Sequence, residues 1–235
     1  MKQPSLIQNA MAITLAFALS TSAAIAADGK SDTTSEKPHS HHDHAAMMAA
    51  MGDMPATKPA LLPDASIYQL EARLTDQNGK VATFTDQAGD VRLVSMFYAS
   101  CKYVCPMIID QLKRIEHELD DEQRQRLRVS MITFDAKHDS PDVLTQLADE
   151  RHIDSARWSL FQPRPSDVRP ISALLGIQYR ELPEGGFNHS SVISLIDADG
   201  RILARTEQLG ASPDPAFVDA VRSALVKTGQ ADTGN

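Results

Sequence analysis

The sequence predicts an α/β fold in which helices flank a mixed central sheet, with a β-hairpin on its N-terminal side. Two observations predict it. Between residues 61 and 229, β-rich runs alternate with segments whose apolar residues recur at helical spacing, and residues 91–98 (VRLVSMFY) have the apolar density of a buried strand. The expected order is a hairpin, two strand–helix units, a helix, a second hairpin and a last helix. We expect residues 61–229 to form one folded domain.

Local signals predict each element in the first half of this domain. Two β-rich runs, 68–74 and 80–84, flank a turn that contains Asn-Gly, which is typical of a hairpin. The buried strand at 91–98 leads into a helix from about Pro106 to Asp120, because apolar side chains recur there with a helical period.

The next elements are predicted by capping residues as well as by periodicity. A second strand is expected over 126–134 and a second helix over 142–151, where Ser140 is the expected N-cap and Pro141 the first helical residue. A short third helix then ends at Gly176.

The C-terminal part is predicted to contain a second hairpin and a helix. The runs 190–197 and 201–206 flank an Asp-Ala-Asp-Gly turn. An amphipathic helix follows over 215–229 and is expected to end at Gly229, which leaves residues 230–235 as a disordered tail.

The first 26 residues are typical of a secretory signal peptide. Lys2 precedes the mostly apolar run 10–27, and Ala24-Ile25-Ala26 supplies the small residues that a signal peptidase accepts, so we expect cleavage after Ala26. An uncleaved membrane anchor is the alternative, but the most apolar part, 10–19, is shorter than the roughly 20 residues that span a bilayer. We therefore expect a periplasmic protein without a firm membrane span.

Residues 27–60 are predicted to be a disordered linker, because they are polar, rich in proline and without apolar periodicity. Their histidines and methionines cluster at His39, His41, His42, His44, Met47, Met48, Met51 and Met54. Imidazole and thioether groups together suit copper in both oxidation states, so these residues are candidates for an auxiliary metal site. The alternative is an incidental linker that binds nickel, zinc or copper loosely.

The charge balance limits the classes of partner. The chain has 23 basic and 31 acidic residues, for a formal net charge of −8. An acidic chain repels phosphate backbones and has no electrostatic attraction to anionic lipid. We expect no nucleic-acid partner.

The two cysteines, Cys101 and Cys105, lie between the buried strand and its helix. This spacing admits a structural disulfide, a redox pair or two ligands of one metal ion. A disulfide ring of so few residues stabilises little, which disfavours a structural role. A helix N-terminus favours thiolate, so at least one thiol is expected to titrate below the usual value of about 8.5. The spacing also differs from the Cys-x-x-Cys of ordinary disulfide oxidoreductases.

Of the four histidines in the predicted domain, His189 is the candidate third ligand. It follows a Gly-Gly turn and precedes a buried-looking strand, whereas His117, His138 and His152 are expected on the surface. Two thiolates and one imidazole suit copper, since thiolate selects Cu(I) and imidazole helps to hold Cu(II). A structural zinc site needs four ligands, and only three candidates are identified in the predicted domain.

The order of elements is that of a thioredoxin-like fold, in which reactive cysteines follow the first central strand. Over about 61–227, the stretches VSMFYASCKYVCP, TFDAKHDSPDVL, LLGIQY and NHSSVISLIDADGRI together resemble the Sco/SenC family of copper proteins. The resemblance implies that Cys101, Cys105 and His189 bind copper, and that the protein helps to insert copper into the binuclear centre of cytochrome c oxidase. The family commonly has proline and aspartate where this chain has Lys102 and Asn188.

Three functions follow from these observations. The leading hypothesis is a periplasmic copper metallochaperone, rather than an enzyme, that delivers Cu(I) or Cu(II) to a copper-receiving protein such as a cytochrome c oxidase subunit. The second is a thiol-disulfide reductase that keeps the cysteines of such a partner reduced through a redox-active Cys101–Cys105 pair. The third is a copper-sequestering or tolerance protein that uses its His/Met tract. A peroxidase is disfavoured because no separate resolving cysteine exists.

Overall fold

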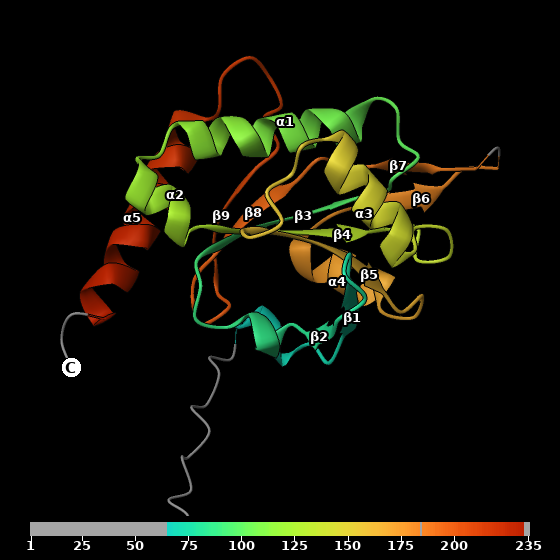
Figure 1. The fold of residues 1–235 in the computed structure, drawn as a ribbon, viewed down its shortest axis with the longest axis horizontal. Helices are drawn as coiled ribbons and strands as arrows, with labels where there is room; N and C mark the ends of the chain where they lie inside the picture. The colour runs from blue at the N-terminus through green and yellow to red at the C-terminus, as the bar shows by residue number, and fades with distance from the viewer. Residues whose placement is uncertain (1–64, 184, 233–235) are drawn as a thin grey trace, which may run out of the picture. The chain divides into compact units, whose positions relative to one another are not determined.

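A mixed sheet of seven strands, in the order β2-β1-β5-β4-β3-β8-β9, runs through the part of the chain described by the computed structural model, residues 65–183 and 185–232 (Figure 1). A separate two-stranded ribbon pairs β6 with β7. The strands are β1 (Arg73–Asp76), β2 (Val81–Thr83), β3 (Arg92–Phe97), β4 (Arg128–Thr133), β5 (Trp158–Pro163), β6 (Tyr179–Glu181), β7 (Phe187–His189), β8 (Ile193–Ile196) and β9 (Ile202–Thr206). The helices are η2 (Ile67–Gln69), η3 (Thr85–Gln87), α1 (Val104–His117), α2 (Asp121–Arg126), α3 (Pro141–Glu150), α4 (Val168–Leu175) and α5 (Pro215–Asp232), of which η2 and η3 are 3₁₀ helices.

The centre of the sheet is parallel and its two edges are antiparallel hairpins. β4 pairs in parallel with both β3 and β5. The hairpin β1–β2 extends one side through an antiparallel β1–β5 pair, and the hairpin β8–β9 extends the other side through β3–β8. The mixed sheet and both hairpins are therefore confirmed, but the first strand, predicted over 68–74, is Arg73–Asp76, and η2 occupies Ile67–Gln69.

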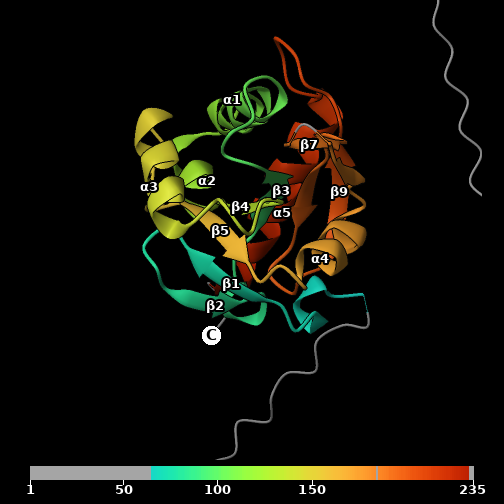
Figure 2. The same ribbon diagram turned by 90° about the vertical axis from the view of Figure 1, so that its right-hand side faces the viewer.

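Both faces of the sheet are covered, which explains why β3 is buried along its whole length, Arg92 and Ser95 included. Leu93 and Phe97 belong to a core that includes side chains of α1, α3 and α5, whereas Val94 and Met96 belong to a second core with α4 and η2. Figures 1 and 2 show α1 and α3 on one side of the sheet and α4 on the other. Alternation along one strand thus supplies two cores, and every residue of β3 is buried.

The predicted caps are confirmed. The Ser140 hydroxyl accepts a hydrogen bond from the Val143 N–H at the start of α3, and Pro141 is the first residue of that helix. Gly176 ends α4 with a φ of 72°, a left-handed conformation that favours glycine.

The sequence did not predict strand β5, helix α2 or the β6–β7 ribbon. Residues 158–163, for which no strand was predicted, form β5 at the interior of the sheet, where Trp158 and Leu160 are buried. Its residues are buried by neighbours on both sides, so the strand lacks the alternation that marks a half-exposed strand. The helix expected to end at Asp120 is followed by α2, which Asp120 caps together with Gln123. The β6–β7 ribbon has only three residues in each strand and gives little periodicity.

Three predicted helix boundaries were wrong, the first being the end of α1, which is His117 and not Asp120. α1 begins at Val104, before Pro106, with Tyr103 as N-cap. α5 continues through Gly229 to Asp232, so residues 230–232 are helical instead of part of a disordered tail. Glycine in a helix costs about 1 kcal/mol relative to alanine, which the neighbouring helix formers offset.

Several predictions fall outside the described residues: the signal peptide 1–26, the linker 27–60 with its histidines and methionines, and residues 233–235. Among the residues that are described, no helix combines the length and apolar character needed to cross a membrane.

Candidate metal centre

The two cysteines follow β3, but only one of them lies on α1. Cys101 is in the loop before the helix and is partly exposed, whereas Cys105 is in the first turn and only 3% exposed. The backbone N–H of Cys105 donates to the Cys101 sulfur at 3.4 Å. A free N–H group at a helix start is thus directed at the Cys101 thiol, which favours its thiolate.

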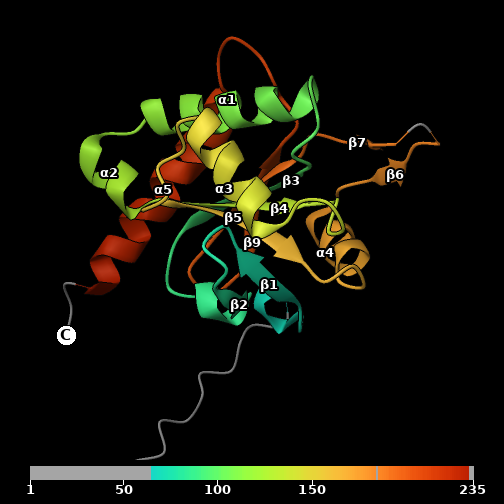
Figure 3. The same ribbon diagram turned by 45° about the vertical axis from the view of Figure 1, so that its right-hand side comes forward.

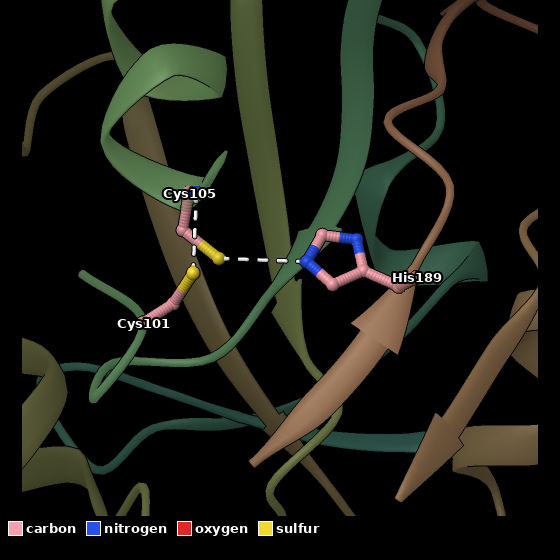
Figure 4. A group of neighbouring side chains, drawn as sticks. All are labelled: Cys101, Cys105 and His189. Atoms are coloured by element: carbon pink, nitrogen blue, oxygen red, sulfur yellow. Dashed lines mark hydrogen bonds between the residues drawn. The ribbon is translucent and has the colours of Figure 1, made fainter. Parts of the chain in front are cut away.

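His189 reaches the cysteines from the other side, at the end of β7. Its Nδ1–H donates to the Ser190 carbonyl at 3.0 Å, because a carbonyl oxygen can only accept. The unprotonated Nε2 then faces the Cys105 sulfur at 3.7 Å (Figure 4). A backbone contact of this kind fixes the tautomer and orientation of a metal-binding imidazole.

The three side chains form one compact group of donor atoms. The sulfurs of Cys101 and Cys105 and a ring nitrogen of His189 all lie within 4.8 Å of one another, and among the described residues no other set of three such side chains meets this criterion. Figure 4 shows both sulfurs and the imidazole directed at one another. Two soft sulfurs and one borderline nitrogen fit copper, and a single ion between them would replace the contact from Cys105 to His189.

The two thiols have opposite electrostatic environments. Burial raises the pKa of the Cys101 thiol, but hydrogen bonds from the Cys105 and Tyr103 backbones and from the Cys105 and Tyr98 side chains outweigh burial, so its pKa lies below the usual value. Burial in the apolar core raises the pKa of Cys105 far above its usual value. The expectation of one low-pKa thiol at the helix N-terminus therefore agrees with the structure for Cys101, and Cys105 is the protonated partner.

Burial also acts on His189. It lowers the pKa of the imidazole, and the hydrogen bond to Ser190 offsets part of that effect. The ring is therefore neutral at pH 7, the form in which a ring nitrogen binds a metal.

An aromatic cluster that was not predicted supports the imidazole. Phe134, at the end of β4, lies with its ring centroid 4.9 Å from that of His189, and Tyr179 and Phe187 of the β6–β7 ribbon stack on Phe134. Phe134 belongs to the stretch TFDAKHDSPDVL, but nothing in that stretch indicates which distant side chain it contacts.

Asp139 was also missed as a residue that supports the site. Its carboxylate is only 3% exposed and accepts hydrogen bonds from the Ala99 N–H at 2.8 Å and from the Thr133 hydroxyl. Burial raises the pKa of Asp139, and the two hydrogen bonds partly offset that effect. The residue links the start of α3 to the cysteine loop, an interaction between segments 40 residues apart in sequence.

The other predicted histidines lie where expected. His117, His138 and His152 are exposed and take no part in the group of three. His138 instead contacts Asp135 at 2.8 Å. The candidate auxiliary ligands, His39, His41, His42, His44, Met47, Met48, Met51 and Met54, lie outside the described residues.

A cleft of about 960 Å³ opens beside this site. Ala99 and Ser100 of the cysteine loop line it, as do Phe134 and the ribbon residues Tyr179 and Phe187. Cys101, Cys105 and His189 are not among the residues that line this cleft, so it adjoins the cysteine loop through Ala99 and Ser100 and not through the ligands themselves.

Comparison with known proteins gives a family match over most of the chain. The SCO1/SenC family model matches residues 63–225. The chain is 26% identical over 144 residues to the mitochondrial protein SCO2 of Saccharomyces cerevisiae; the match covers 55% of this chain and 44% of that protein, so the chain spans less than half of that relative.

Solved structures show the same fold. Yeast Sco1 with copper bound is 20% identical, with a TM-score of 0.56, over 70% of this chain and 93% of that one. BsSco, a member of the Sco family of cytochrome c oxidase assembly proteins for which a disulfide switch was identified, is 21% identical, with a TM-score of 0.58, over 68% of this chain and 94% of that one. These matches confirm the predicted thioredoxin-like α/β fold.

Proposed function

This chain belongs to the SCO1/SenC family, and on that basis we propose that it is an extracytoplasmic copper metallochaperone. The observation that carries the proposal is the convergence of Cys101, Cys105 and His189, whose donor atoms lie within 4.8 Å of one another. In this proposal the three side chains hold one ion of Cu(I) or Cu(II) and pass it to a partner by ligand exchange.

The thiols and the imidazole have separate roles in binding. Cys105 must lose its proton when its sulfur binds copper, so binding releases protons to solvent. Soft thiolate sulfur favours Cu(I), and the neutral imidazole of His189 favours Cu(II). Cys101 is the more exposed of the two cysteines, so we expect a partner ligand to displace Cys101 before Cys105.

A titration of the reduced full-length protein tests this function. Cu(I) and Cu(II) are added in competition with chelators, to the wild type and to a variant whose eight His/Met tract residues are replaced. One tight equivalent of copper is expected in both proteins. Groups that only orient a metal ligand are worth about 10–100-fold in affinity, so His189→Ala should weaken Cu(II) binding by more than about 100-fold.

His117→Ala is the matched control, because His117 is an exposed histidine at the C-terminal end of α1, the end opposite to Cys105, and is not one of the three ligands. It should bind copper as the wild type does. Unchanged affinity in His189→Ala would refute the site. Loss of most copper capacity with the tract replaced, together with unchanged capacity in Cys101→Ala, would favour the sequestration function instead.

A thiol-disulfide reductase is the second candidate, and the unlike thiols favour it. The low pKa of the partly exposed Cys101 suits an attacking thiolate. That thiolate attacks a partner disulfide, forms a mixed disulfide and releases one partner thiolate. Cys105, once deprotonated, attacks the Cys101 sulfur and releases the second, so two electrons pass to the partner and a Cys101–Cys105 disulfide remains. This function predicts that His189→Ala still reduces the partner.

We propose that the recipient is a copper protein such as cytochrome c oxidase, which would take the copper into its binuclear site. This is in line with the description of BsSco as a member of a family of oxidase assembly proteins. Lys102 and Asn188, where the family commonly has proline and aspartate, are both exposed. They change the surface that a partner meets and leave the three ligand side chains in place. Transfer of copper from the loaded protein to an isolated oxidase copper domain, followed by its absorption spectrum, tests this recipient.

Export to the periplasm, with cleavage after Ala26, stays a prediction from the sequence. The N-terminal residue of the protein recovered from the periplasm tests it, and Ala27 is the expected first residue.

A further inference from the structure

Asp139 joins the loop that carries Cys101 to the centre of the sheet. One oxygen of its carboxylate accepts hydrogen bonds from the Ala99 backbone N–H, at 2.8 Å, and from the Thr133 hydroxyl. Ala99 is two residues before Cys101, and Thr133 is the last residue of β4. Asp139 is only 3% exposed, so these bonds replace contacts with water that the carboxylate has lost.

The sheet topology brings these segments together. β3 and β4 are parallel neighbours, with Phe97 opposite Thr133, so their carboxyl ends lie at the same edge of the sheet. Figure 3 shows the loop from β3 to α1 and the loop from β4 to α3 leaving the sheet at this edge. The cysteine loop and residues 133–139 therefore start side by side, and the Asp139 carboxylate links them.

The acceptor side of this link is held in place by the central strand. Thr133 is fully buried, and its hydroxyl also accepts the Asp135 N–H at 2.9 Å. The Asp139 N–H in turn donates to the Asp135 carbonyl at 3.0 Å. Backbone and side-chain hydrogen bonds thus keep the Asp139 carboxylate at the end of β4.

The donor side is the loop whose position determines where the Cys101 sulfur lies. The Cys101 N–H donates to the Tyr98 carbonyl at 3.2 Å, a bond within the turn that does not attach it to another segment. The bond from Ala99 to Asp139 does attach it, across 40 residues of sequence. Because two residues span at most about 7 Å, a fixed Ala99 amide restricts where Cys101 can lie.

We propose that Asp139 is a positioning residue whose carboxylate, bound to the Ala99 amide and the Thr133 hydroxyl, fixes the Cys101 loop so that its sulfur meets the other two copper ligands. The part of this proposal that concerns copper rests on the proposed function, whereas the restraint on the loop belongs to the metal-free protein.

Asp139→Ala in the full chain removes the acceptor. In the reduced, metal-free protein, amide exchange at Ala99 should become at least roughly tenfold faster, because hydrogen bonds to a charged group are among the stronger ones. Copper affinity, measured in the variant whose eight His/Met tract residues are replaced, should fall roughly tenfold.

The same substitution in a Cys101→Ala background shows whether Asp139 acts through Cys101. The loop then carries no ligand, so Asp139→Ala should not weaken further the copper binding that Cys105 and His189 retain. A residue that stabilises only the fold would lower the affinity by the same factor in both backgrounds.

Asp139→Asn is the conservative variant, and it keeps the proposal testable if Asp139→Ala does not fold. It retains the shape and an acceptor oxygen but loses the charge that strengthens the bond. Exchange at Ala99 should therefore be about threefold faster than in the wild type, a smaller change than in Asp139→Ala.

Asp167→Ala is the matched control. Asp167 is also buried, and its carboxylate accepts the Arg73 N–H at 3.0 Å, a link between distant segments that does not include the cysteine loop. The control should lower the free energy of unfolding and leave Ala99 exchange and copper affinity unchanged.

Three results would each overturn the proposal: wild-type exchange at Ala99 in both Asp139 variants, an equal effect of Asp167→Ala, or a full further loss of affinity in the Cys101→Ala background. If the wild type binds no copper through its two cysteines and His189 but Ala99 exchange responds as expected, the proposed function fails and the restraint on the loop stands.

Discussion

Cys105 and His189 face each other across 3.7 Å, yet the segments that carry them are supported in different ways. Cys105 is in the first turn of α1, which packs on the fully buried strand β3 at the centre of the sheet. His189 is the last residue of β7, in a two-stranded ribbon outside the main sheet. The rings of Tyr98, directly after β3, and Phe134, directly after β4, pack against its imidazole. The Cys105 sulfur is thus fixed by the core of the domain, whereas the imidazole depends on a few local contacts.

This difference suits a protein that both binds and releases a metal ion. A buried Cys105 keeps one ligand in place, and both the loop that carries Cys101 and the ribbon that carries His189 can move without unfolding of the sheet. A substitution at the buried cysteine and a substitution beside the imidazole should therefore lower copper affinity by different amounts.

The largest effect is expected from removal of the buried thiol. Cys105→Ala should lower the affinity for both Cu(I) and Cu(II) by more than about 100-fold, because a ligand is worth more than the groups that orient it. The fold should persist, since the substitution removes one buried atom. Copper competition titrations measure the affinity, and circular dichroism monitors the fold. If Cys105→Ala bound copper with an affinity within tenfold of the wild type, Cys105 would not be a copper ligand.

A smaller effect is expected from the support of the imidazole. Phe134→Leu should weaken Cu(II) binding about tenfold, because it removes the ring packed against His189. It should also lower the free energy of unfolding by about 1–2 kcal/mol. Phe161→Leu is the control: Phe161 is buried in the same core, and its ring makes no contact with His189. A similar loss of stability with normal copper binding is expected there, and equal copper binding in both variants would contradict a support role for Phe134.

The two thiols should also differ in how fast they are alkylated at different pH values. Cys101, whose pKa is lowered, should react with iodoacetamide below the pH at which an ordinary thiol does, and its rate should fall only as the pH drops through that lowered pKa. Cys105 is buried with a raised pKa and should stay nearly unreactive up to about pH 9. Mass spectrometry of the labelled peptides separates the two residues. Faster labelling of Cys105 would reverse the assignment.

The smallest expected effect is on stability in mild acid. The pKa of His189 is lowered in the folded chain, so the unfolded chain binds more protons between the two pKa values. Its contribution is fully present above the unfolded pKa of about 6.5 and declines as the pH falls toward the folded pKa. Urea midpoints at several pH values should show a shallower acid slope in His189→Gln than in the metal-free wild type. Equal slopes would show that burial does not shift the imidazole.

The sequence predicts the cysteine side of the site better than the histidine side. A buried strand, a helix with apolar periodicity and the placement of Cys101 and Cys105 between them are all local patterns, and the structure agrees with them apart from the start of α1 at Val104. The position of His189 after a Gly-Gly turn indicated a ligand, but the ribbon that carries it has too few residues to give a periodic signal.

The supporting residues could not be predicted because their contacts join distant segments. Phe134 and Tyr98 act on His189 only once β4, the cysteine loop and the ribbon are assembled, and Asp139 acts on Ala99 from 40 residues away. Strand β5 was not predicted because it lies inside the sheet, between β1 and β4. Burial on both faces removes the alternation of apolar and polar residues that marks a half-exposed strand. Long-range packing has no local pattern in a single sequence.

X-ray absorption spectroscopy at the copper edge of the full-length protein, loaded with one equivalent of Cu(I), tests the central claim most directly. Coordination by two sulfurs and one imidazole nitrogen is expected, with loss of the nitrogen in His189→Ala and loss of one sulfur in Cys105→Ala. The tract variant, with its eight histidines and methionines replaced, should give the wild-type spectrum. A site of nitrogen and thioether ligands that disappears with the tract would contradict a copper centre built from Cys101, Cys105 and His189.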